Sequence, residues 1–196
     1  TLNEVASALL ANPAAAASVP LGIVPMGTGN DFIKSLSGFV PNDIVGGVAR
    51  LAAGRTQRID AGHVRVHSAT QPGHSSYFLN NLALGIDAHV AAESHNVPYL
   101  RGTLAYLGGA VRALFTYQAR PLLLRFADHE LHQPWLLASI ANGRCQGGGF
   151  WLTTASPARP MAASTCAWSK SCGCTMMLFY IPRAMHGAHT HLARVP

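Results

Sequence analysis

Apolar residues recur at helical spacing in two segments of the first 57 positions. In segment 1–12 they fall on one face, and Thr1 and Glu4 match the Ser/Thr-x-x-Glu capping box that opens many helices. Segment 41–54 has a similar spacing and ends in a glycine, a residue that commonly closes a helix. The pattern therefore predicts a helix over each segment. The expected caps of the second helix are Asn42 or Asp43 at its start and Gly54 at its end.

A different pattern lies between these two helices. Residues 21–25, Leu-Gly-Ile-Val-Pro, form a short apolar run stopped by proline, which predicts a buried strand. The alanine run at 14–17 leads into this strand, and a glycine-bracketed turn follows it. A further helix is expected to start at Asn30 or Asp31, because either side chain can accept hydrogen bonds from the first free backbone amides.

Beyond residue 57 the apolar spacing changes from helical to alternating, which is typical of strands with one buried face. A helical insertion is expected at 98–117. A short helix–strand–helix piece followed by a β-rich part favours two domains, 1–57 and 58–196, of which the first is too short to bury its own core. The expected strands lie within 58–66, 75–88, 121–131 and 134–142.

Composition and charge narrow the classes of partner. Hydrophobic residues make up 49% of the 196 positions, enough for a core, and no apolar run approaches the roughly 20 residues that cross a bilayer. A net charge of +6 favours acidic partners such as nucleotides or anionic membranes. Nucleic acid is not expected as a partner, because lysine is rare and the arginines are scattered rather than clustered.

The four cysteines do not suggest a disulfide framework, because three of them crowd into 166–174, and a reducing cytoplasm is the expected compartment. Together with C-terminal histidines they offer soft metal ligands. Their spacings do not match a standard zinc module, so no metal ligand is assigned. The residues concerned are Cys166, Cys172, Cys174, His186, His189 and His191.

The glycine turn at 27–29 offers the first specific chemistry. Glycine lets the backbone approach a ligand closely, and free N–H groups at the start of a following helix face an anion such as phosphate. A turn that serves the structure and binds nothing fits the same residues, so both interpretations stay open at this point.

Several motifs stand in a fixed order along the chain. Residues 1–5 resemble the end of Gly-Gly-Asp-Gly-Thr-x-Asn-Glu-Val, and residues 25–32 resemble Pro-x-Gly-Thr-x-Asn-Asp-Phe. Together they resemble the diacylglycerol kinase catalytic family, which includes bacterial lipid kinases and sphingosine kinases. The resemblance runs in register through nearly the whole chain except 155–177. The later segments that agree with it, including its Ile-Asp-x-Gly and Asn-Gly-x-x-x-Gly-Gly-Gly motifs, are 58–64, 80–90, 141–150 and 182–195.

This resemblance implies a lipid kinase that transfers a phosphoryl group from ATP, with Mg²⁺, to a lipid hydroxyl such as that of diacylglycerol or a long-chain base. The implied fold is α/β plus β: the remnant of a Rossmann-like α/β nucleotide domain in 1–57, then a β-sandwich domain in 58–196 with a helical insertion. The nucleotide would lie in the cleft between the two domains. The residues implied to bind it are Thr1, Gly27, Thr28, Gly29, Asn30 and Asp31.

Two further acidic residues, Asp60 and Asp87, lie within motifs of the family. An incoming hydroxyl needs a carboxylate to take its proton, and Asp60 is the candidate for a catalytic residue. For each of the two, a carboxylate that holds a turn or a backbone N–H is an equal alternative. Asn142 and the glycines at 147–149 are expected to serve packing of the sandwich and its close approach to the cleft.

The chain also departs from the family pattern. Gly-Gly-Asp-Gly does not precede Thr1, a closing Asp-Gly-Glu segment is missing, and 155–177 has no carboxylate where an Asp-Gly-x-Leu-Asp strand would hold a structural Mg²⁺. Read one base out of frame, codons near 160–176 can encode that strand. We therefore hypothesise a shifted frame there, which the DNA across codons 155–178 would test. Residues 1–196 alone are expected to be inactive.

Two alternatives to a lipid kinase remain. One is a non-catalytic remnant that binds lipid or a partner; the other, NAD kinase, is disfavoured by the motif at 25–31. A lipid substrate also implies transient contact with a membrane, hence a cytoplasmic protein that is peripheral at the inner face. Apolar residues and arginines in 98–123 could form an amphipathic interfacial surface, although ordinary core packing explains the same residues.

Overall fold

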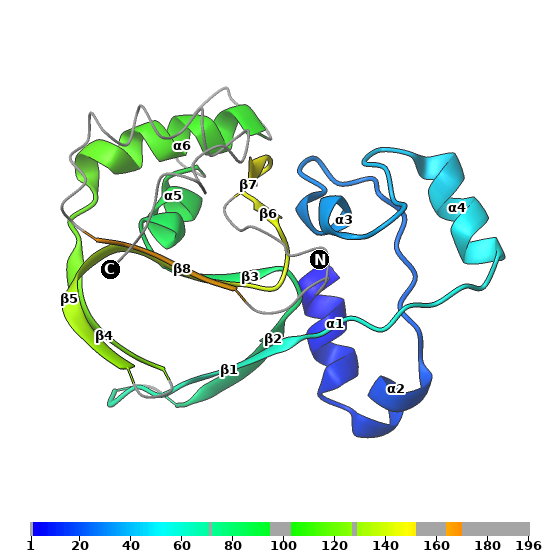
Figure 1. Cartoon of the computed structure of the whole chain (residues 1–196), viewed down its shortest axis with the longest axis horizontal. Helices are drawn as coiled ribbons and strands as arrows, with labels where there is room; N and C mark the ends of the chain where they lie inside the picture. The colour runs from blue at the N-terminus through cyan, green and yellow to red at the C-terminus, as the bar shows by residue number, and fades with distance from the viewer. Residues whose placement is uncertain (1, 71, 95–102, 127–128, 152–163, 170–196) are drawn as a thin grey trace.

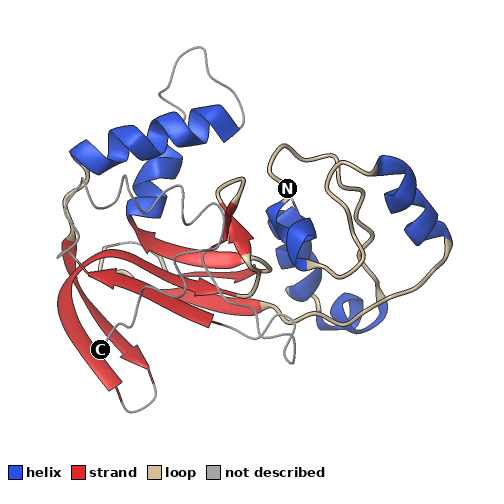
Figure 2. Ribbon diagram, turned by 45° about the horizontal axis from the view of Figure 1, so that its top comes forward, coloured by secondary structure: helices blue, strands red, loops and turns tan. Residues whose placement is uncertain are grey.

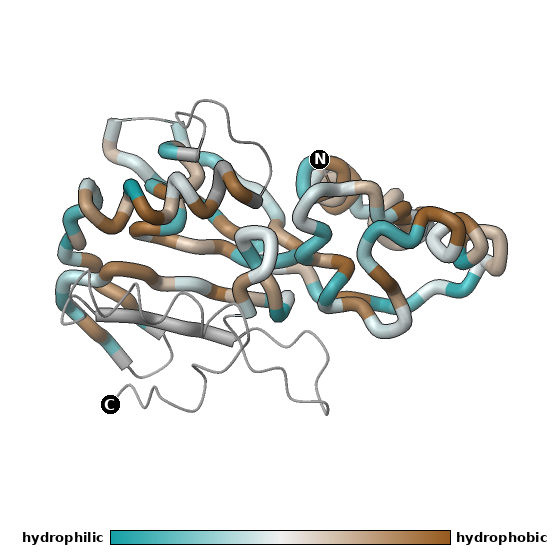
Figure 3. The backbone as a smooth tube through the Cα atoms, turned by 90° about the horizontal axis from the view of Figure 1, so that it is seen from above, coloured by the Kyte–Doolittle hydropathy of each residue, from teal (hydrophilic) through white to brown (hydrophobic). Residues whose placement is uncertain are grey.

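Two lobes lie side by side in the computed structural model of the chain (Figure 1). The structure describes residues 2–70, 72–94, 103–126, 129–151 and 164–169. Within these residues the N-terminal lobe holds helices α1 to α4, and the C-terminal lobe holds the strands together with α5 and α6. Hydrophobic residues are distributed through both lobes (Figure 3).

The N-terminal lobe begins with two helices, α1 (Leu2–Leu10) and α2 (Pro13–Ser18). The helix expected in 1–12 is therefore confirmed as α1, although Thr1 of its capping box lies outside the described residues. The alanine run was expected to lead into a strand, but it is helical. The reason is local: the side chain of Asn12 accepts hydrogen bonds from the amides of Ala14 and Ala15, at 3.1 and 3.3 Å, and so caps α2.

Helix α4 (Ile44–Ala52) follows the sequence rules for helix ends. Oδ1 of Asp43 accepts a hydrogen bond from the amide of Gly46 at 2.8 Å, as expected of an N-cap. Gly54 has a φ of 65°, the left-handed conformation that commonly closes a helix. Both predicted ends of this helix are confirmed.

The prediction of a strand at 21–25 is wrong for this structure. The stretch is a loop with no strand partner among the described residues. The hydrogen bond near its end, from the amide of Met26 to the carbonyl of Val24 at 2.9 Å, stays within the loop itself. A strand needs a neighbour to satisfy its backbone groups, and the described part of this lobe offers none. The Rossmann-like sheet is therefore absent from the described residues.

The described strands pair antiparallel in three sheets. The longest strand is β5 (His129–Ala141), whose first half pairs with β4 (Arg120–Phe126). Its second half lies between β3 (Asn81–Gly85) and β8 (Ser164–Ser169). The two smaller sheets are β1 (Gly62–Val66) with β2 (His74–Phe78), and β6 (Cys145–Gln146) with β7 (Phe150–Trp151). Each of the four segments expected to hold strands does so.

Two helices, α5 (Ile86–Ser94) and α6 (Thr103–Thr116), lie over one face of the four-stranded sheet (Figure 2). Helix α6 confirms the expected insertion, whereas α5 was not predicted, and residues 86–88 were wrongly assigned to a strand. The two helices and β5 share a core cluster made of Ile86, Val90, Ala113, Leu114 and Leu137. None of the described helices is long and apolar enough to span a membrane.

A second core cluster joins the two lobes. Residues Ala6, Phe32, Ile33 and Leu36 of the N-terminal lobe pack with Leu79, which lies between β2 and β3. Helix α1 is also tied to this region, because Oδ1 of Asn3 accepts a hydrogen bond from the amide of Leu79 at 3.1 Å. As expected, the N-terminal lobe does not close a core of its own.

Candidate functional site

The glycine turn at 27–29 is held in shape by Asn30. This residue has a φ of 50°, and its Oδ1 accepts a hydrogen bond from the amide of Gly27 at 3.1 Å. Its Nδ2 donates to Oδ1 of Asn42 at 2.8 Å and to the carbonyl of Pro25 at 3.4 Å. The helix expected to start at Asn30 or Asp31 is confirmed as α3 (Asp31–Ser35), but the side chain of Asn30 does not cap it. The amide oxygen is already used to close the turn.

Closure of the turn leaves other amides available. Among the described residues, the amide of Gly27 has a protein acceptor, whereas those of Thr28 and Gly29 have none. Thr28 is exposed and Gly29 is half-buried. A methyl group added at Gly29 would lie 3.4 Å from Cα of Gly148, which shows how closely the C-terminal lobe approaches the turn. The turn thus lies at the junction of the lobes with donors suited to an anion.

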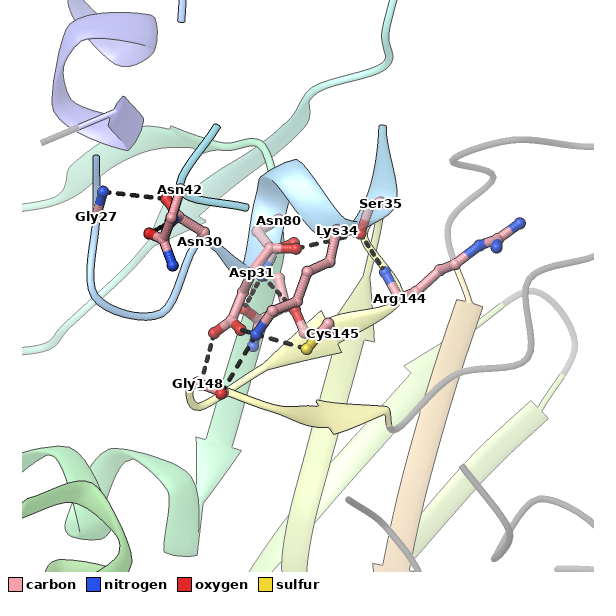
Figure 4. Close-up of polar contacts among 11 residues, drawn as sticks. Gly27, Asn30, Asp31, Lys34, Ser35, Asn42, Asn80, Arg144, Cys145 and Gly148 are labelled. Carbon is pink, nitrogen blue, oxygen red and sulfur yellow. Dashed lines mark hydrogen bonds and ion pairs between the residues drawn. The ribbon is translucent and has the colours of Figure 1, made fainter. Parts of the chain in front are cut away.

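Asp31 connects the two lobes through two contacts, with Gly148 and Cys145, and also pairs with Lys34 of its own helix (Figure 4). Its Oδ2 accepts a hydrogen bond from the amide of Gly148 at 2.7 Å. Its Oδ1 lies 3.1 Å from Nζ of Lys34 and accepts a hydrogen bond from Sγ of Cys145 at 3.2 Å. Nζ of Lys34 also donates to the carbonyl of Gly148 at 3.3 Å. The Asp31 side chain is 18% exposed, and both of its carboxylate oxygens accept hydrogen bonds from other residues of the protein.

Further hydrogen bonds extend this junction on the side of the C-terminal lobe. The amide of Arg144 donates to Oγ of Ser35 at 2.8 Å. Nδ2 of Asn142 donates to the carbonyl of Leu79 at 2.9 Å and to that of Asp60 at 2.6 Å. Asn142 is buried, so these bonds hold the start of β1 against the end of β5. This agrees with the packing role expected for Asn142.

Cys145 is a buried thiol, 1% exposed, at the centre of the junction. Burial raises its pKa to about 12, the charge of Asp31 and its hydrogen bond act in the same direction, and Lys34 opposes them. A thiol that stays protonated at neutral pH is a poor nucleophile. We therefore assign Cys145 a structural part at this site.

The raised pKa of Cys145 predicts a loss of stability at high pH. The thiol of the unfolded chain ionises first as the pH rises, so the free energy of unfolding contributed by this group is present below about pH 9 and falls toward pH 12. We expect Cys145→Ser, which cannot ionise there, to lose less stability over this range. Urea titrations of both proteins would measure the difference, and parallel pH profiles would contradict the assignment.

The remaining candidates are Asp60, Asp87 and Thr1. Asp60 lies in the exposed loop before β1, where its backbone carbonyl, not its carboxylate, is bound by Asn142. Asp87 lies in the first turn of α5. Thr1 falls outside the described residues, as does most of 155–177 with its shifted-frame hypothesis. No group of three or more His, Cys, Asp or Glu residues that could hold a metal occurs in the described part of the chain.

The contact between Asp31 and Cys145 was not predicted from the sequence. Among the interactions of Asp31, only the ion pair with Lys34 has a recognisable spacing in the sequence. Lys34 follows Asp31 by three positions on a helix, a spacing that favours an ion pair. Cys145 stands 114 residues away, and no local pattern indicates its proximity.

Comparisons with known proteins agree with the motif order. The sequence model of the diacylglycerol kinase catalytic domain matches residues 1–64, and that of the YegS C-terminal NAD kinase beta sandwich-like domain matches residues 80–195. A protein of Yersinia enterocolitica named "Probable lipid kinase YegS-like" is 31% identical over 150 residues, which is 76% of this chain and 47% of that protein. A diacylglycerol kinase of Mycobacterium tuberculosis is 28% identical over 92% of this chain and 57% of its own length.

The fold has a counterpart among solved structures. A structure from Bacillus anthracis str. Sterne, named for a diacylglycerol kinase, superposes with a TM-score of 0.55 at 19% identity, over 82% of this chain and 51% of that chain. This likeness concerns the fold alone. The chain spans about half the length of the curated relatives that it matches.

Proposed function

Because the chain belongs to the diacylglycerol kinase catalytic domain family, we propose that it serves ATP-dependent phosphorylation of a lipid hydroxyl. The observation that supports this most directly is the glycine turn at 27–29, whose unpaired amides lie at the junction of two lobes. Transfer of a phosphoryl group depends mainly on positioning and charge stabilisation, which such a junction can supply.

The residues of the turn fit a phosphate group. The amides of Thr28 and Gly29 would donate to phosphate oxygens, while Asn30 keeps the turn closed from within. Asp31 would act indirectly, because its carboxylate is bound to Lys34, Cys145 and Gly148 and fixes the turn against the C-terminal lobe. Thr1 would belong to the same nucleotide loop, as the resemblance implies. ATP is thus the proposed nucleotide.

Proton transfer and metal binding are less well supported by the described residues. Asp60, in an exposed loop, remains our candidate for the carboxylate that accepts the proton of the lipid hydroxyl. Mg²⁺ is expected of the family, yet the described residues do not gather a set of ligands for it. We therefore derive no step that involves the metal.

We further propose that this polypeptide, as its sequence stands, has little or no kinase activity. Segment 155–177 carries no carboxylate where the family pattern has an Asp-Gly-x-Leu-Asp strand. The same observation favours the second candidate function, a non-catalytic remnant that binds lipid or a partner. Because the ligand is a lipid, we propose that the protein lies in the cytoplasm and makes transient contact with the inner face of the membrane.

Nucleotide binding is the property that tests this proposal first. We expect MgATP to bind the wild-type chain and Gly29→Ala to weaken binding about tenfold, because a methyl group there keeps phosphate from the amides and costs a charge-assisted hydrogen bond. Gly73→Ala is the matched control, since its added methyl also lies 3.4 Å from its nearest neighbour but in the β1–β2 turn. Isothermal titration measures all three proteins.

Two results would count against the proposal. Absence of MgATP binding by the wild-type chain would remove the nucleotide site, and equal binding by Gly29→Ala would move it away from the turn. Transfer of labelled γ-phosphate to diacylglycerol or sphingosine in mixed micelles tests activity separately. Turnover well above background would overturn the proposal that the chain is inactive and leave the lipid kinase function standing.

A further inference from the structure

Helix α6 carries a stripe of large apolar side chains that no described residue covers. Leu104, Val111 and Phe115 are 62, 40 and 70% exposed. Their spacings of seven and four residues place them on one side of the helix. The opposite side is packed, because Ala113 is fully buried and belongs to the cluster shared with α5 and β5. The exposed stripe is therefore not part of the core of this lobe.

The position of α6 makes the stripe an outer surface. Among the described elements, α6 is the outer of the two helices above the sheet, with α5 between it and the strands (Figures 1 and 2). The stripe follows the length of a single helix. A flat or deformable apolar layer fits such a surface better than a protruding segment of another protein does.

The exposed charged side chains of α6 and of the start of β4 are basic. Helix α6 contains no acidic residue. Arg112, 60% exposed, pairs through Nε with Oε2 of the largely buried Glu93 at 2.6 Å. Arg120, at the start of β4, is exposed and has no hydrogen-bond or ion-pair partner within the described ranges. An exposed cation in the chain segment that follows the apolar stripe complements a surface of anionic headgroups.

We propose that this face of α6, formed by Leu104, Val111 and Phe115 with Arg120 at its end, docks the protein on a bilayer that contains anionic lipid. The inference rests on the proposed lipid kinase function, because a lipid hydroxyl is presented at such a surface. The apolar side chains enter the boundary between headgroups and acyl chains, and Arg120 contacts the headgroups. Docking is peripheral and reversible.

Vesicle flotation tests this surface without nucleotide and without a phosphorylatable lipid. We expect the wild-type chain to float with phosphatidylcholine vesicles that contain phosphatidylglycerol, and the double variant Leu104→Ser with Phe115→Ser to bind about tenfold more weakly. Arg120→Glu should weaken binding about fivefold on vesicles with phosphatidylglycerol and little on phosphatidylcholine alone. Val45→Ser is the matched control, because Val45 is an 80% exposed apolar residue of α4 in the other lobe.

The possible outcomes distinguish failure of the docking proposal from failure of the proposed kinase function. If the wild-type chain does not float, or if Val45→Ser weakens binding as much as the double variant, the docking face is wrong even when MgATP still binds. If sedimentation shows that the double variant dissociates a dimer while vesicle binding is unchanged, the face joins two copies of the chain and the membrane proposal fails. Circular dichroism checks folding, and the single variant Phe115→Ser tests the same face where the double variant unfolds. Loss of MgATP binding alone would remove the kinase proposal and leave docking measurable.

Discussion

Replacement of Asp31 by alanine is expected to lower the free energy of unfolding by about 3 kcal/mol. The change removes the acceptor of the Gly148 amide, the partner of Lys34 and the acceptor of the Cys145 thiol. The ammonium of Lys34 is only 20% exposed, so it would be left largely desolvated without its counter-charge. Urea denaturation followed by far-UV circular dichroism measures the loss.

Substitution of Asp31 by asparagine separates the effect of losing the charge from the effect of losing the side chain. Asp31→Asn keeps the shape and one acceptor, so we expect a smaller loss than with alanine. Asp43→Asn is the matched control, because Asp43 also accepts a backbone N–H bond but in an exposed N-cap that asparagine can replace. If Asp31→Ala changes stability no more than Asp43→Asn does, then the Asp31 contacts do not hold the two lobes together.

Replacement of Gly85 by alanine is the second change with a large expected effect. Gly85 has a φ of 95°, and a methyl group there would overlap the carbonyl oxygen of Leu136 on the neighbouring strand. Backbone strain and the clash together should cost about 3 kcal/mol or more, since the obstacle is main chain and cannot rotate away. Thermal unfolding should show a clear fall in the midpoint temperature.

Gly54 supplies the control for this substitution. Its φ of 65° is also positive, but no atom lies within 4 Å of an added methyl group. Gly54→Ala should therefore cost about 1 kcal/mol, the contribution of the left-handed backbone without the clash. Equal losses for the two variants would show that the close approach of Leu136 to Gly85 is not what requires a glycine. The sequence motif around Gly85 would then need another explanation.

The sequence predicted those features that depend on residues close together in the chain. The ends of α4 follow from the capping chemistry of Asp43 and the left-handed Gly54, and the strands follow from alternation. The helix at 86–94 was missed because its apolar residues are not gathered on one side. The strand at 21–25 was wrong because a strand also requires a neighbour, which a local pattern cannot supply.

The candidate site divides in the same way. The glycine turn could be recognised from five consecutive residues, and the structure places it at the junction of the lobes. The role of Asn30 could not be predicted, because its side-chain oxygen can either cap α3 or accept the hydrogen bond that closes the turn. In the structure it closes the turn. Cys145 and Gly148 come to Asp31 only through the fold of the later chain. The boundary near residue 57 and the nucleotide-binding residues stay predictions.

The bonds from α1 to Tyr77 in β2 and to Leu79 just after it have a consequence for dissection of the protein. Asn3 and Ser7 hydrogen-bond to the backbone of Leu79 and Tyr77, so the beginning of the chain is fastened to a segment some 70 positions later. A protease that cuts the exposed stretch at 53–58 would leave two fragments that remain associated, because α1 in the first fragment is hydrogen-bonded to the second. Folding, too, must close this long loop before α1 gains its contacts with Tyr77 and Leu79.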